Sequence, residues 1–328
     1  DVPEIGLKLL EQVGWELRPV HYIDGDVLYD GSSGNRFKGV FTKLRALSLV
    51  EYKKIVVVDA DLLVRHNVDE LFDLPAPAAL RREASGNTKT SDKMRGFIER
   101  ATGKLVGGIN AGVMVLEPNE SDYNAVLKDI DKANKEWGHS VVESGGRGSN
   151  MPEQDYLTRF FGKDWRALGV ELNFQLHQLA FCNRAGLERC RRLTLDLNED
   201  VHIVHFSAVP KPVNHLLETH YRAMSRQEFL RGVLFPYYKK KLCTHRNTGK
   251  SNSKHIQIRI FDAIMLFGDE WLEAWDALAE RIGDAQLVVD AAIDETITSI
   301  TTRKRRPLQC LSKGREEGRG ERCIFPRI

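Results

Sequence analysis

The run Ile55-Val56-Val57-Val58 constrains the fold of this chain more than any other segment. Four consecutive β-branched or apolar residues favour a strand buried on both faces, as in a parallel sheet that is covered by helices. The run ends in Asp59-Ala60-Asp61, so two carboxylates follow the predicted strand directly. In such sheets, ligands bind beyond the carboxyl ends of the strands. We therefore predict a ligand site at Asp59 and Asp61.

Helical and strand patterns alternate along the rest of the chain. A helix near the end is marked by Trp271, Trp275, Leu278 and Ile282, and it needs a core to pack on. The other predicted strands lie at 15–20, 113–116 and 201–206, and the other predicted helices at 3–13, 41–50, 121–137 and 154–161. This alternation indicates an α/β fold with a mostly parallel, Rossmann-like sheet flanked by helices.

The composition is that of an ordinary globular protein, with 42% apolar and 29% charged residues among 328. The net charge is only +2, so no overall field favours nucleic acid as a partner. No stretch approaches the roughly 20 apolar residues that a transmembrane helix needs. The cysteines form no Cys-x-x-Cys pair, which argues against structural zinc and against a disulfide framework. They are Cys182, Cys190, Cys243, Cys310 and Cys323.

The chain starts at Asp1 and not at methionine, so a preceding leader or anchor would not be visible in it. Free thiols indicate a reducing compartment. We therefore expect a cytoplasmic protein, and the Golgi lumen is the alternative if an N-terminal anchor has been lost.

A second polar group follows the predicted strand at 201–206. The imidazole of His205 can serve as a metal ligand beside Asp59 and Asp61, and Lys211 can contact a phosphate as a point charge. Carboxylates suit Mg²⁺ or Mn²⁺, whose remaining positions substrate phosphates can fill. Each motif alone also fits a solvated turn or a structural histidine, but the two together favour a metal site.

Two further motifs offer polar side chains for a sugar. Asn110-Ala111-Gly112 precedes the predicted strand at 113–116, and a carboxamide can both donate to and accept from hydroxyls. Glu153, Gln154 and Asp155 stand at the start of a predicted helix, where they could line a sugar pocket. Taken singly, the first motif is more typical of a turn into a strand. The acids of the second also complement a helix dipole.

In order and approximate spacing, these motifs resemble those of glycosyltransferase family 8, the group of glycogenin and galactinol synthase. The resemblance runs from about Val13 to Val213. It is carried by Phe41–Leu44, Val57–Asp61, Asp69–Phe72, Asn110–Val113, Glu153–Asp155, Leu172–Phe174 and His205–Pro212. The chain departs from the family at Ala208, commonly Gly, and at Val213, commonly Trp. The family opens with a strand and a helix, whereas this chain begins near the next helix, so we expect the first strand and helix to be missing.

The resemblance implies a GT-A fold, a UDP-sugar donor and Mn²⁺, with Mg²⁺ as the alternative metal. It implies that Asp59, Asp61 and His205 hold the metal and that Lys211 contacts the diphosphate. The remaining donor-binding residues that it implies are Lys43, Ala60, Asn110, Ala111, Gly112 and Gln154. The catalytic candidates are Glu153, Asp155 and Lys211.

The family moves a hexose with retention of anomeric configuration, and both a double displacement and a front-face attack remain open. The acceptor is also open and could be a carbohydrate, a polyol or a protein, as is a homodimeric assembly. Glycogenin-like proteins glucosylate their own tyrosine after the segment that matches Asn173. This chain has no tyrosine between Tyr156 and Tyr221, which excludes self-priming at that position.

We expect residues 1–235 to form the catalytic domain, 236–300 a helical extension and 301–328 a basic tail without fixed structure. Two alternatives to an active transferase are a non-catalytic scaffold of the same fold and a haloacid-dehalogenase-type phosphatase. The phosphatases also use Asp-x-Asp after an apolar strand, but they usually have Thr or Val where Leu63 stands here.

Overall fold

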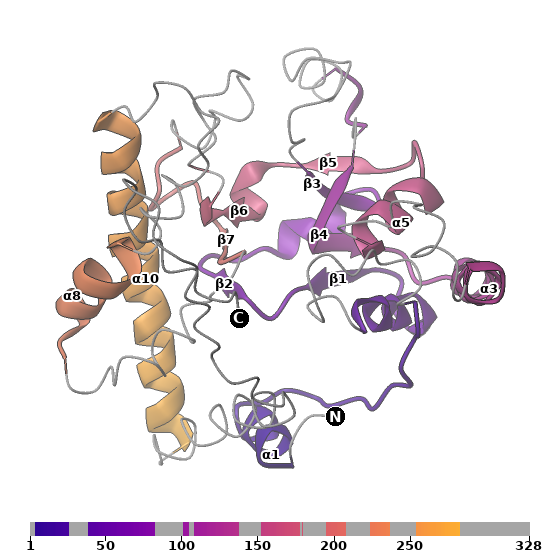
Figure 1. Cartoon of the computed structure of the whole chain (residues 1–328), viewed down its shortest axis with the longest axis horizontal. Coiled ribbons are helices and arrows are strands. Elements are labelled where there is room, and N and C mark those ends of the chain that lie inside the picture. The colour runs from indigo at the N-terminus through magenta and orange to yellow at the C-terminus, as the bar shows by residue number, and fades with distance from the viewer. Residues whose placement is uncertain are drawn as a thin grey trace, which may run out of the picture.

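The computed structural model describes residues 4–25, 39–82, 101–104, 108–137, 152–177, 179, 195–207, 224–236 and 254–282 (Figure 1). All five cysteines lie outside the described residues, as do Lys211, Ala208 and Val213. The same holds for the tail predicted at 301–328.

The first sheet has four strands in the order β1-β4-β3-β5, namely β1 (Ile55–Val58), β4 (Ile109–Leu116), β3 (Ala78–Arg81) and β5 (Arg166–Leu168). Strand β4 pairs antiparallel with both β1 and β3, and β3 pairs parallel with β5. Every residue of β3 and β4 is buried, whereas Val58 on β1 is 43% exposed. The strand predicted at 55–58 is confirmed, but its burial on both faces is not. Strand β1 lies at the edge of the described sheet, where it forms hydrogen bonds to β4 on one side only.

The second sheet has the order β2-β7-β6, namely β2 (Leu62–Val64), β7 (Ile203–His205) and β6 (Phe174–Gln175). Strands β2 and β7 are antiparallel, and β6 and β7 are parallel. The predicted α/β class is confirmed. The prediction of a mostly parallel sheet is wrong, because three of the five described strand pairings are antiparallel. A β-branched run favours a strand but does not encode its direction, which the connections decide.

One face of the first sheet is covered by η3 (Val40–Ser48), α3 (Glu120–Trp137) and α5 (Pro152–Phe160). The predicted helix at 41–50 is a 3₁₀ helix, and its buried residues are Phe41, Leu44 and Leu47. A spacing of three residues places these side chains on one face, because a 3₁₀ helix has three residues per turn. The helices predicted at 121–137 and 154–161 are confirmed as α3 and α5.

The long helix α10 (Lys254–Ile282) runs along one side of the molecule, and α3 lies on the opposite side (Figure 1). The core between α10 and the second sheet also includes α8 (Arg226–Phe229) and η8 (Leu230–Leu234). Phe267 of α10 meets Phe174 of β6 with ring centroids 5.6 Å apart. Arg65 joins β2 to α10 through an ion pair with Glu270 and lies over the Phe267 ring at 4.9 Å. The helix predicted from the tryptophans is thus confirmed, together with the core that it needs.

Three other short helices are α1 (Glu4–Gln12), η4 (Asp69–Asp73) and η5 (Val170–Leu172). The predicted first helix is confirmed as α1. The strand predicted at 15–20 is wrong, because this segment lies in no strand and Trp15 is 63% exposed. Apolar alternation alone does not make a strand when no neighbouring strand supplies the hydrogen bonds.

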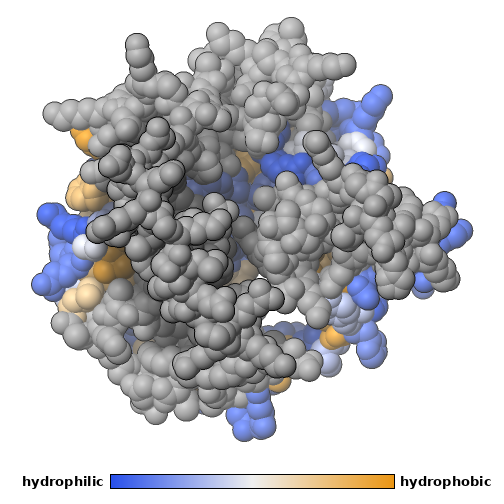
Figure 2. Space-filling view, viewed as in Figure 1, coloured by the Kyte–Doolittle hydropathy of each residue, from blue (hydrophilic) through white to orange (hydrophobic). Residues whose placement is uncertain are grey.

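On the face in Figure 2, the coloured atoms are mostly hydrophilic, and the hydrophobic ones lie in separate spots. Separate apolar side chains are usual on a protein surface. None of the described helices combines the length and the apolar character that crossing a membrane requires.

Candidate metal and donor site

The triplet Asp59-Ala60-Asp61 connects the two sheets, because β1 belongs to the first sheet and β2 to the second. The backbone N–H of Asp59 donates to the Gly112 carbonyl on β4 at 2.9 Å. The backbone N–H of Phe206, directly after β7, donates to the Asp61 carbonyl at 3.0 Å. These two bonds hold the ends of the triplet to different sheets, so both carboxylates lie where the sheets meet.

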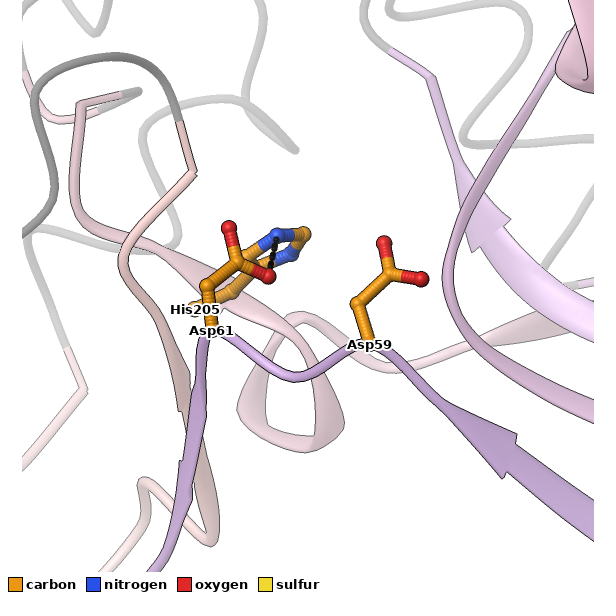
Figure 3. A group of neighbouring side chains, drawn as sticks. All are labelled: Asp59, Asp61 and His205. Carbon is orange, nitrogen blue, oxygen red and sulfur yellow. Dashed lines mark ion pairs between the residues drawn. The ribbon is translucent and has the colours of Figure 1, made fainter. Parts of the chain in front are cut away.

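His205, the last residue of β7, completes a cluster with Asp59 and Asp61 (Figure 3). One potential ligand atom from each side chain lies within 4.8 Å of the others. The imidazole is almost fully buried, and its Nε2 lies 3.3 Å from Oδ1 of Asp61. The three predicted metal ligands are therefore brought together, although Asp61 and His205 stand 144 positions apart in the chain (205 − 61).

Lys43 links this cluster to a buried glutamate. Its Nζ lies 2.7 Å from Oδ1 of Asp59 and 3.9 Å from Oε1 of Glu153, which is only 3% exposed. Burial raises the pKa of Glu153, and the positive charge of Lys43 offsets part of that rise. Among the described residues, Oε2 of Glu153 has no hydrogen-bond partner. Glu153 is therefore a carboxylate held in a poorly solvated place beside the cluster.

Asn110 and Gly112 lie inside β4 and not in a turn before a strand, which corrects the sequence-based prediction. Ala111 packs in the core with η3, α3 and α5, whereas Asn110 and Gly112 lie beside Asn173 and His205, where the pairing of β4 with β3 shifts register. Oδ1 of Asn110 accepts from the Gly112 N–H at 3.1 Å and from Nδ2 of Asn173 at 2.8 Å. Oδ1 of Asn173 in turn lies 2.9 Å from Nδ1 of His205.

Asn173 was not among the predicted site residues, although it is fully buried beside the cluster. The only signal in the sequence was its place in the segment Leu172-Asn173-Phe174, which belongs to the family resemblance. No rule of spacing connects Asn173 to a histidine 32 residues further on.

The other predicted residues occupy different surroundings. Gln154 is buried in the first turn of α5, and Ala60 is exposed between the two carboxylates. Asp155 forms an ion pair with Arg82, the residue after β3, which sequence reasoning did not identify. Lys211 lies outside the described residues, so its position relative to the cluster stays a prediction.

These features define an α/β protein with a candidate divalent-metal centre at the junction of two mixed sheets. The family model described as glycosyl transferase family 8 matches residues 15–214, which is more than half of the 328-residue chain. The chain therefore belongs to glycosyltransferase family 8. The sheets and helices described above are accordingly its form of the GT-A fold that the sequence predicted.

Individual relatives match this chain at modest identity and over part of their length. An uncharacterized protein of Acanthamoeba polyphaga mimivirus is 35% identical over 55% of this chain and 57% of its own length. Galactinol synthase 7 of Arabidopsis thaliana is 27% identical over 55% of this chain and 54% of its own. Inositol phosphorylceramide glucuronosyltransferase 1 of the same plant is 29% identical, with shares of 39% and 19%. The chain thus covers 57% or less of the length of each of these relatives.

Among solved structures, the chain is similar to the glycosyltransferase GlyE of Streptococcus pneumoniae. The TM-score is 0.36 at 18% identity, over 54% of this chain and 40% of the other. Family membership rests on the sequence match and not on this weak structural similarity.

Proposed function

We propose that this chain is a retaining glycosyltransferase that moves a hexose from a UDP-sugar to an acceptor with the help of a divalent metal. The observation that carries the proposal is the convergence of Asp59, Asp61 and His205 at one point of a family 8 protein. Relatives are named for glucuronosyl transfer and for galactinol synthesis, so the transferred unit could be a neutral hexose or a uronic acid. The acceptor is proposed only by class, as a carbohydrate, a polyol or a protein.

The residues present fit Mn²⁺, with Mg²⁺ as the alternative. Two carboxylates and one imidazole offer the oxygen and nitrogen atoms that such ions accept, and three protein ligands leave places for phosphate oxygens. Glycine at position 112 lets the imidazole lie close to β4, which supports a built site over a chance cluster. When bound, the metal would neutralise negative charge that develops on the departing diphosphate.

Two lysines would act on the donor's charge. Lys43 already lies between Asp59 and Glu153, where it reduces the repulsion between the two carboxylates. We assign it to donor binding. We assign Lys211 to the diphosphate, where a positive charge stabilises the leaving group most strongly in the transition state.

Glu153 is the carboxylate that we place nearest the anomeric carbon. In a double displacement, its oxygen would bond to that carbon while the bond to the diphosphate oxygen breaks and its electron pair leaves with UDP. The oxygen of the acceptor hydroxyl would then bond to the same carbon while the bond to the carboxylate breaks, and the hydroxyl proton would pass to a phosphate oxygen of UDP. In a front-face reaction, Glu153 would instead stabilise the positive charge of the sugar ring. Asp155, held by Arg82, is the second candidate.

The donor sugar would be oriented by hydrogen bonds. We assign its hydroxyls to Asn110 and Gln154, which are both buried. Asn110 lies near His205 of the cluster, and Gln154 follows Glu153 in the chain. Ala60, Ala111 and Gly112 would contact the donor through backbone N–H and C=O groups, because their side chains have no polar atoms.

The competing reading is a scaffold that keeps the fold without turnover. The phosphatase alternative is set aside, because the chain belongs to a glycosyltransferase family. Hydrolysis and transfer should be measured over a panel of UDP-sugars with Mn²⁺ and with chelator, and the products identified by mass spectrometry. Metal-dependent release of UDP supports the transferase. Absence of turnover across the panel, with intact fold and metal binding, supports the scaffold.

We also propose that residues 1–235 form the catalytic domain and 236–300 a helical extension of it. The contact of α10 with the core of the second sheet, through Ile260, Ile264 and Phe267, supports an extension that is integral to the fold. The cytoplasmic location expected from the sequence stays a prediction, and a homodimeric assembly stays open.

A further inference from the structure

We infer that Asn173 and Asn110 are positioning residues that keep a proton on Nδ1 of His205. This leaves Nε2, the nitrogen that faces Asp61, as the atom that can bind a metal. The inference concerns the hydrogen bonds behind the imidazole, and its consequence for metal binding rests on the proposed function.

The backbone N–H of Gly112 fixes the orientation of the Asn110 carboxamide. The backbone N–H of Gly112 can only donate, so the Asn110 atom that faces it at 3.1 Å is the amide oxygen. The same oxygen faces the amide of Asn173 at 2.8 Å. An oxygen without hydrogen accepts only, so the Asn173 atom that faces it is the amide nitrogen. The orientation of both carboxamides therefore follows from one backbone group.

The orientation of Asn173 fixes which nitrogen of His205 carries a proton. Since the nitrogen of Asn173 is used toward Asn110, its oxygen is the atom that lies 2.9 Å from Nδ1 of His205. This oxygen can only accept, so Nδ1 must donate and must carry a proton. In the neutral imidazole the lone pair is then on Nε2, which lies 3.3 Å from Oδ1 of Asp61.

Burial makes this chain of hydrogen bonds hard to replace. Asn173 is fully buried, His205 is 4% exposed and Asn110 is 9% exposed. A buried polar atom that loses its partner costs free energy, so water does not readily substitute for either carboxamide. Partners behind a metal-bound imidazole typically contribute about 10–100-fold to metal affinity.

The test is nitrogen NMR of the full chain with ¹⁵N-labelled histidine, at a pH about two units above the ordinary imidazole pKa of about 6.5. The chain has 10 histidines, so the His205 signals are assigned by their loss in His205→Gln. We expect Nδ1 of His205 to be protonated both without metal and with saturating Mg²⁺. An Nδ1 without a proton in the wild type overturns the inference.

Two variants separate positioning from mere packing. Asn173→Leu has nearly the same shape but no acceptor, so we expect the proton to move to Nε2, where Asp61 can accept it. Asn110→Asp keeps an acceptor toward both Gly112 and Asn173, so we expect Nδ1 to stay protonated. Unchanged Nδ1 protonation in Asn173→Leu contradicts the inference. If that variant does not fold, the wild type and Asn110→Asp still decide it.

Calorimetric titration with Mn²⁺ gives the second readout. We expect Asn173→Leu to bind Mn²⁺ about 10–100-fold more weakly than the wild type. Asn119→Ala is the matched control. Oδ1 of Asn119 accepts from the Ser121 N–H at 2.8 Å, so this substitution removes only the cap at the start of α3. If the wild type shows the Nδ1 proton but binds no Mn²⁺, the hydrogen-bond chain stands and the proposed metal-dependent function falls.

Discussion

The imidazole of His205 lies directly against the backbone of Gly112. A Cβ atom at position 112 would stand 2.4 Å from Cε1 and 2.6 Å from Nδ1 of the imidazole. Real contacts of this kind are not that short, so either the imidazole or β4 would have to move. Although the pairing of β4 with β3 shifts register at this point, the Gly112 carbonyl accepts from the Asp59 N–H and the Gly112 N–H donates to Oδ1 of Asn110. We therefore expect the imidazole to be the group that moves. Glycine at this position is therefore a condition for the place of the proposed metal ligand.

We predict that Gly112→Ala weakens Mn²⁺ binding by more than about 10-fold while the chain stays folded, which is the low end for disturbing a residue that positions a metal ligand. Calorimetric titration measures the affinity and circular dichroism checks the fold. Gly232→Ala is the control, because a Cβ there would meet nothing within 4 Å. Wild-type affinity in Gly112→Ala would show that the imidazole is not a ligand or that β4 adapts.

We predict that Asp61→Ala abolishes Mn²⁺-dependent turnover of UDP-sugar without unfolding the chain. Asp61 is a proposed direct ligand, so the loss of affinity should exceed the about 10–100-fold expected for a residue behind a ligand. Asp73→Ala removes an exposed carboxylate at the end of η4 and should behave as the wild type. Near wild-type turnover in Asp61→Ala would make the metal assignment wrong.

We predict that Glu153→Gln loses most of its transfer activity yet gains stability relative to the wild type as the pH rises. Because the pKa of Glu153 is raised in the folded state, its contribution to stability is complete below the unfolded pKa of about 4.3 and is lost as the pH rises through the folded pKa. Glutamine does not ionise and escapes this loss. Melting temperatures at about pH 4 and about pH 7 measure the difference.

Glu228→Gln is the control of opposite sign for this experiment. Hydrogen bonds from Ser225 lower the pKa of Glu228, so its contribution is present above the unfolded pKa and lost as the pH falls. Glu228→Gln should therefore be less stable than the wild type at neutral pH. A melting difference for Glu153→Gln that shows this same trend would contradict the raised pKa.

We predict that Lys211→Ala lowers kcat by about 10²-fold or more, the scale of removing one preorganised electrostatic group. Charge on the diphosphate grows in the transition state, so the lysine should matter more there than in the bound donor. Steady-state kinetics with varied UDP-sugar measure kcat and KM separately. A rise in KM at constant kcat would assign Lys211 to donor binding alone.

We predict that Glu270→Gln lowers the free energy of unfolding by about 1 kcal/mol without changing Mn²⁺ affinity. Its carboxylate lies 2.8 Å from Nη2 of Arg65, whose side chain is only 4% exposed. The loss stays small because Glu270 itself is 28% exposed and Arg65 keeps its hydrogen bonds to the carbonyls of Leu197 and Val201. Urea unfolding gives the stability. A two-step unfolding curve in the wild type would instead mean that α10 folds apart from the sheets.

The sequence by itself determined the local features of this protein. The β-branched run at 55–58 sufficed for a strand, and the apolar residues at spacings of three and four sufficed for η3, α3 and α10. The polar residues that follow two of the strands sufficed to identify Asp59, Asp61 and His205 as candidates. These features depend on neighbours within a few residues, and a pattern of side chains expresses such neighbours directly.

Only the tertiary structure decided how these pieces meet. The direction of each strand and the edge position of β1 depend on pairing with distant segments. Strands of two to four residues, such as β6, are too short to show the two-residue alternation by which a strand is recognised in a sequence. The place of Asn173 behind His205 and of Lys43 beside Glu153 likewise arises from contacts between segments far apart in the chain. Hydrogen bonds and burial act through space, so a side chain's partners are settled only when the whole chain has packed.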